Sequence, residues 1–129
     1  MKVKIIMAFL IVICSLLACN KEEVKLTQEE EGRELNEIAS RIIAITESIS
    51  CEDASEWAYV GFGSKPCGGP SGYIAYPVNI NTPQFLALVE QYRQAQMSYN
   101  QNWGLVSNCM IEPAPSDIIC EDGRPVLVY

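Results

Sequence analysis

Apolar residues recur every three or four positions in two stretches of the chain, and this spacing predicts two amphipathic helices. The first should span about residues 28–48, because Thr27 and Glu30 have the spacing of a capping box. The second should extend to about residue 100, because Thr82 fits an N-cap and Pro83 the first helical position. The apolar faces comprise Leu35, Ile38, Ile42, Ile45 and Ile49 in the first helix and Phe85, Leu88, Val89, Tyr92, Ala95 and Tyr99 in the second.

Strand-like segments lie between and after the predicted helices. Residues 56–62 are rich in aromatic and β-branched side chains, and further short strands are expected at residues 73–76 and 105–110. Residues 117–121 and 124–129 flank Asp122-Gly123, a dipeptide that favours a two-residue hairpin turn because that turn needs positive φ. Helices with a single apolar face pack most simply on one sheet. We therefore predict an α+β domain with two helices on a small, mainly antiparallel sheet.

A glycine-rich loop should separate two of these strands. Five of the eight glycines lie between Gly61 and Gly72, which disfavours regular structure there. A loop held by Cys67 and stiffened by prolines would lose little conformational entropy on binding, so we expect the Gly63–Gly72 loop to be a binding loop. Its candidate contact residues are Lys65, Pro66, Gly68, Gly69, Pro70, Tyr73 and Tyr76.

The N-terminal residues follow the pattern of a secretory signal. A short basic start precedes a nearly continuous apolar run over residues 5–17, which in a helix would cover about 20 Å, less than the ~30 Å hydrocarbon core of a bilayer. The stretch Leu16-Leu17-Ala18-Cys19 resembles the lipobox of bacterial lipoproteins, which implies cleavage before Cys19 and lipidation of its thiol and new amino group. The alternative is an uncleaved membrane anchor. We expect a signal peptide over 1–18, a flexible acidic tether over 19–27 and one domain over 28–129.

The residues after the lipobox indicate where in the cell envelope the protein is located. Asn20-Lys21-Glu22-Glu23 resembles the export signal that sends lipoproteins of Bacteroidota to the cell surface. The resemblance implies an outer-membrane lipoprotein exposed at the cell surface, with the periplasmic leaflet as the alternative.

Four cysteines remain after the signal and the lipidated position, and an even number outside the cytoplasm predicts two disulfides. Four cysteines can pair in three ways. We favour Cys51–Cys67 and Cys109–Cys120, because both links are local and each fixes a segment without regular structure. A thiol oxidoreductase would need a Cys-x-x-Cys pair, and a zinc site would need closely spaced pairs; the sequence has neither.

Charge and composition narrow the chemistry. Without residues 1–18 the chain has seven basic and sixteen acidic residues, a net charge of −9 that disfavours nucleic acid and anionic lipid as partners. The chain has no histidine, the usual general base and the commonest metal ligand. We expect no catalytic residue, no metal and no cofactor. The weaker alternatives are a calcium site at Glu52, Asp53 and Glu56 and a Ser64–Lys65 catalytic pair.

Three motifs resemble a group of small lipoproteins from Bacteroidota. They are Lys65-Pro66-Cys67-Gly68-Gly69-Pro70 followed by Tyr73 and Tyr76, then Trp103-Gly104-x-x-Ser107-x-Cys109, then Cys120-Glu121-x-Gly123-x-Pro125-Val126. The resemblance implies origin and architecture and no activity.

The function we expect is a lipid-anchored, non-enzymatic module that binds a protein or carbohydrate. Its aromatic anchors would be Trp57, Tyr59, Tyr73 and Tyr76, which otherwise pack the core. The alternatives are an inhibitor of an envelope or extracellular hydrolase, such as a protease or lysozyme, and an accessory subunit of an outer-membrane complex.

Overall fold

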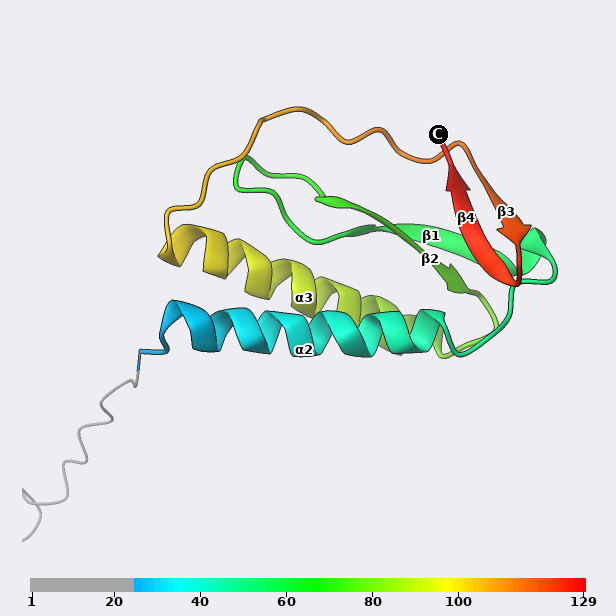
Figure 1. Cartoon of the computed structure of the whole chain (residues 1–129), viewed down its shortest axis with the longest axis horizontal. Helices are drawn as coiled ribbons and strands as arrows, with labels where there is room; N and C mark the ends of the chain where they lie inside the picture. Colours follow the sequence, from blue (N-terminus) through cyan, green and yellow to red (C-terminus); the bar gives the residue numbers. More distant parts are fainter. Residues whose placement is uncertain (1–24) are drawn as a thin grey trace, which may run out of the picture.

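The computed structural model describes residues 25–129, which form an α+β fold in three layers (Figure 1). The predicted signal peptide, the predicted lipidation site Cys19 and the predicted tether as far as residue 24 lie outside the described residues. Between residues 25 and 129, no helix is both long and apolar enough to cross a membrane. The elements in order are α2 (Gln28–Thr46), the 3-10 helix η1 (Ala54–Glu56), β1 (Trp57–Phe62), β2 (Gly72–Pro77), α3 (Thr82–Asn102), β3 (Asp117–Glu121) and β4 (Arg124–Val128).

Local signals place the starts of both helices. The capping box at the start of α2 is confirmed, because Thr27 Oγ1 accepts the Glu30 N–H and the Glu30 carboxylate accepts the Thr27 N–H at 2.8 Å. These hydrogen bonds from Thr27 hold the pKa of Glu30 below its usual value. The N-cap of α3 differs from the prediction by one residue: Asn81 Oδ1 accepts the Gln84 N–H, so Thr82 and Pro83 both lie within the first turn. The Thr82 hydroxyl instead donates to the Val78 carbonyl at 3.4 Å.

The β1–β2 hairpin forms the middle layer, and its two faces contact different elements. Ala58, Val60, Phe62, Ile74 and Tyr76 pack against α2 and α3, where Ile42, Phe85 and Val89 complete the main core. Trp57 and Ala75 point to the opposite face and pack against Ile118 of the β3–β4 hairpin. This alternation follows the two-residue period of a strand. Figure 1 shows α2 and α3 running antiparallel beneath the hairpin.

The predicted single sheet is two separate antiparallel hairpins, β1–β2 and β3–β4. The turn between β3 and β4 is confirmed, since Asp122 and Gly123 have φ of 49° and 74°. The strand predicted at residues 105–110 is wrong: residues 105–115 form no regular structure. Within the described chain no strand lies alongside this segment, so it has no partner for a ladder of hydrogen bonds.

The disulfides also differ from the predicted pairing. Residues 25–129 contain two disulfides, Cys51–Cys120 and Cys67–Cys109, in place of the two local links. Cys51 precedes the six-residue strand β1 and Cys67 follows it, so the strand holds them about 20 Å apart. Cys51 instead meets the second hairpin, where its N–H donates to the Gly123 carbonyl at 2.9 Å.

Candidate functional site

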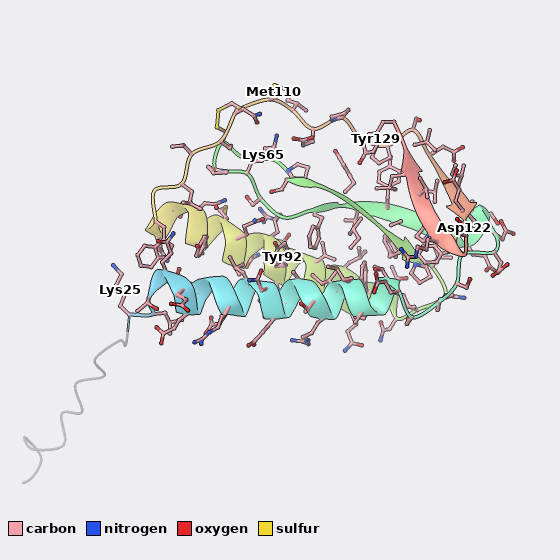
Figure 2. All side chains as sticks on the ribbon, in the orientation of Figure 1. Lys25, Lys65, Tyr92, Met110, Asp122 and Tyr129 are labelled. Carbon is pink, nitrogen blue, oxygen red and sulfur yellow. A yellow bond between two sulfur atoms is a disulfide. The ribbon has the colours of Figure 1, made fainter. Side chains whose placement is uncertain are left out.

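The predicted binding loop is built into the fold more deeply than expected. Lys65, one of the predicted contact residues of this loop, has a side chain only 11 % exposed. Its Nζ donates to the Met110 carbonyl at 2.8 Å and forms an ion pair with Glu112. Figure 2 shows Lys65 and Met110 at the same end of the molecule, away from Asp122. Lys65 therefore joins two segments of the protein and is not free to bind a ligand.

Polar side chains of α3 fix the start of the same loop. Gln96 Oε1 accepts the Ser64 N–H at 2.6 Å, and Asn100 Nδ2 donates to the Ser64 carbonyl at 2.8 Å. Gly63 adopts φ +74°, and a Cβ there would lie 2.5 Å from Gln96 Oε1. The sequence offers a weak signal for these contacts, because Gln96 and Asn100 are one helical turn apart.

The four predicted aromatic anchors divide between core and surface. Trp57 and Tyr76 are buried, so they pack the core. Tyr59 and Tyr73 lie on the outer face of the β1–β2 hairpin, with ring centroids 5.8 Å apart in an edge-to-face arrangement. Tyr73 is therefore the one aromatic residue of the predicted loop set that a ligand can reach.

Tyr73 lines a cavity of about 660 Å³ beside strand β2. Three elements enclose it: the C-terminal end of α2, strand β2 and the β3–β4 turn. Ile49, Ile74, Ala75, Pro125 and Leu127 supply apolar lining, and Thr46, Glu47, Ser50, Tyr73, Asp122, Gly123 and Arg124 complete it.

Covalent and polar links hold the walls of this cavity in place. The Cys51–Cys120 disulfide ties the segment after α2 to β3. Ser50 Oγ donates to Glu52 at 2.8 Å and contacts the Gly123 carbonyl at 3.4 Å. Gly123 has φ +74°, and a Cβ there would lie 2.8 Å from Ser50 Oγ, so a side chain would strain the turn and displace this hydroxyl.

The polar groups of the cavity have mixed charge. Glu47 and Asp122 supply two carboxylates, and Arg124 supplies one guanidinium. The salt bridges among residues 25–129 are Lys65–Glu112 and Glu90–Arg93, so neither engages Arg124. Sequence reasoning missed this set because its members come from three segments that only the fold brings together.

Two of the three acidic residues considered for calcium, Glu52 and Asp53, have other roles. Asp53 caps η1 by accepting the Ser55 N–H at 2.8 Å, a hydrogen bond that lowers the pKa of Asp53. Glu52 accepts from Ser50. Within residues 25–129 no three histidine, cysteine or acidic side chains are grouped so as to hold a metal ion.

A second surface lies on the segment between α3 and β3, residues 105–115, here called the strap. Val106 and Ile111 are both 92 % exposed and Met110 is 69 % exposed. The Cys67–Cys109 disulfide and the Lys65 contacts fasten the strap to the glycine loop. Large apolar side chains held outward in this way are typical of a protein contact surface.

Comparison with protein-family models, curated proteins and solved structures finds no match to this chain. The cavity and the strap are therefore the two observations from which a function can be argued.

Proposed function

We propose that this protein is a lipid-anchored, non-enzymatic protein of the outer membrane, exposed at the cell surface, that binds a short saccharide. The binding site is the cavity between α2, β2 and the β3–β4 turn. The anchor rests on the apolar run and lipobox that end at Cys19. The observation that carries the binding role is the cavity's volume of about 660 Å³, since ligand sites typically measure ~300–1,000 Å³.

The lining favours a saccharide over other small ligands. Sugar hydroxyls both donate and accept hydrogen bonds, so they match the carboxylates and the guanidinium that line the same cavity. The exposed face of Tyr73 can pack against the apolar face of a sugar ring, as aromatic side chains with one wet edge do. Two carboxylates against one guanidinium disfavour an anionic ligand.

A screen with a defined set of probes tests this proposal. The detergent-extracted protein is applied to a glycan microarray, and each bound glycan is titrated by calorimetry. Tyr73→Ala and Arg124→Ala should each weaken binding about tenfold, which corresponds to ~1.4 kcal/mol. Tyr129→Ala and Arg41→Ala are matched controls outside the cavity and should bind as the natural protein does. The proposal is wrong if no glycan binds, or if bound glycans are indifferent to both cavity variants.

The strap favours a second role, as a subunit of an outer-membrane assembly. Val106, Met110 and Ile111 expose apolar surface that a partner protein would cover. A partner that co-purifies from solubilised membranes with the natural protein should be lost with Val106→Asp. Unchanged recovery of every co-purifying protein would exclude the strap as the contact surface.

A further inference from the structure

We infer that the strap pairs with the strap of a second copy of this chain, in an antiparallel β-ladder centred on Asn108. This inference rests on the assembly role proposed for the strap and is independent of the saccharide cavity. It identifies the occupant of the exposed apolar surface as the same surface on another copy, related by a two-fold axis.

The strap sequence is symmetric about Asn108. Reading outward in either direction, Asn108 is followed by one small residue and then by two apolar ones: Ser107, Val106 and Leu105 on one side, and Cys109, Met110 and Ile111 on the other. In an antiparallel pair centred on Asn108, Val106 lies opposite Met110 and Leu105 opposite Ile111. A two-fold contact requires such self-complementarity, because each residue meets its counterpart from the other half of the segment.

Most backbone N–H and C=O groups of the strap have no partner in the described chain, the exceptions being the Leu105 N–H and the Met110 carbonyl. Residues 105–115 contain no turn or bend, and every residue from Gly104 to Ile111 is exposed. Leu105 donates its N–H to the Asn100 carbonyl, and no other residue of the strap makes a backbone–backbone hydrogen bond with the described chain. Pro113 and Pro115 lack an N–H, so they confine pairing to residues 105–112.

The distribution of charged residues allows two copies of the chain to contact each other at the strap. The chain is acidic, with a net charge of −7, so most of its surface repels another copy. From Gln94 to Ile111 the sequence contains no charged residue. The charges at the edge of this stretch, Lys65 and Glu112, are already paired with each other.

The expected dimer is weak in solution and stronger on a membrane. One strand from each copy buries less than the ~1,200 Å² that separates stable interfaces from transient ones. Copies anchored in the same leaflet share a high effective concentration, which raises the dimer fraction without new contacts. Pairing of two straps needs no rearrangement of the domain, because the Cys67–Cys109 disulfide already holds the strap in place.

The test exploits the residue on the two-fold axis. Across such an axis the Cα atoms of the two copies of residue 108 lie about 4.5–5.5 Å apart. Side chains of equal charge at this position therefore repel each other, and side chains of opposite charge attract. Full-length copies with two different epitope tags are co-expressed and cross-linked in intact membranes. The membranes are then solubilised, and the recovery of one tag with the other is measured. Pairs of Asn108→Asp copies, and pairs of Asn108→Lys copies, should lose about tenfold in recovery. Mixing Asn108→Asp with Asn108→Lys should restore it.

Control variants test whether the effect is specific to residue 108. Asn79→Asp and Asn79→Lys change an exposed asparagine elsewhere and should leave recovery unchanged. Equal thermal denaturation of all variants shows that folding is intact. The inference is overturned if the natural copies do not co-purify, if like-charged pairs co-purify normally, or if the mixed pair fails to recover. Loss of a different protein with Val106→Asp would keep the assembly role and overturn the second copy as its partner.

Discussion

At the scale of single residues, backbone conformation and contacts determine a residue's role more than its chemical type does. Lys65 looks like a free cation in the sequence, yet its amine binds the Met110 carbonyl and Glu112. Gly63 looks like one of several loop glycines, yet its φ of +74° and its distance to Gln96 leave no room for a side chain. The role of each residue depends on a partner more than thirty positions away.

Gly63→Ala should destabilise the domain by about 2 kcal/mol, the range for a strained backbone position. An alanine Cβ would lie 2.5 Å from Gln96 Oε1 and 3.0 Å from Ser71 Oγ. Gly72→Ala is the matched control, because no heavy atom lies within 4 Å of its Cβ position. Urea unfolding measures both free energies, and equal losses would contradict the role assigned to Gly63.

The carboxyl of Glu90 should titrate far below its usual range. Hydrogen bonds from the Arg93 guanidinium, then from Gln94, lower the pKa of Glu90 to about 2. Because this pKa is depressed, the associated stability is present above the unfolded value near 4.5 and is lost as pH falls from there towards about 2. NMR titration of the side-chain carboxyl measures the pKa, and Arg93→Ala should raise it. A Glu90 pKa near 4.5 in the natural protein would refute the assignment.

At the scale of elements, signals carried by neighbouring residues predict structure well. The Thr27–Glu30 capping box and the Asp122-Gly123 turn each depend on a few consecutive residues, and both are confirmed. The predicted strand at residues 105–110 is wrong because a strand needs a partner, which its own sequence cannot specify. The disulfide pairing is wrong for a related reason: β1 separates Cys51 from Cys67 by its full length.

Lys65→Met should release the strap while leaving the rest of the fold in place. The change keeps the apolar stem but removes the donor to Met110 and the partner of Glu112. Hydrogen exchange followed by mass spectrometry should show faster exchange in residues 105–112 and little change in α2. Lys25→Met, at an exposed lysine before α2, should leave both unchanged. Uniform acceleration across the domain would show that Lys65 supports the whole fold and not the strap alone.

At the scale of the whole molecule, two disulfides tie together segments far apart in sequence. Their sequence separations are 69 and 42 residues. On the loop-entropy model each contributes about 4 kcal/mol, more than the local links expected from the sequence. Cys51–Cys120 joins the β3–β4 hairpin to the segment that follows α2, and Cys67–Cys109 joins the strap to the glycine loop. The cavity could not be predicted, because its walls come from segments that meet only after folding.

The two disulfides should differ in their resistance to reduction. Cys67 and Cys109 are both exposed, whereas Cys51 is buried and Cys120 is partly buried. A thiol reductant can therefore reach Cys67–Cys109 first. Graded reduction followed by alkylation and mass spectrometry should label Cys67 and Cys109 before Cys51 and Cys120. Simultaneous labelling of all four cysteines would mean that the strap and the β3–β4 hairpin become accessible to the reductant together.

Peptide mapping under non-reducing conditions, on protein extracted from native membranes, tests the architecture most directly. We predict an acylated Cys19 at the mature N-terminus and two fully formed links, Cys51–Cys120 and Cys67–Cys109. This result would establish the anchor and the fixed frame that holds the cavity and the strap. An unmodified Cys19, a Cys51–Cys67 link or free thiols among the four would contradict it.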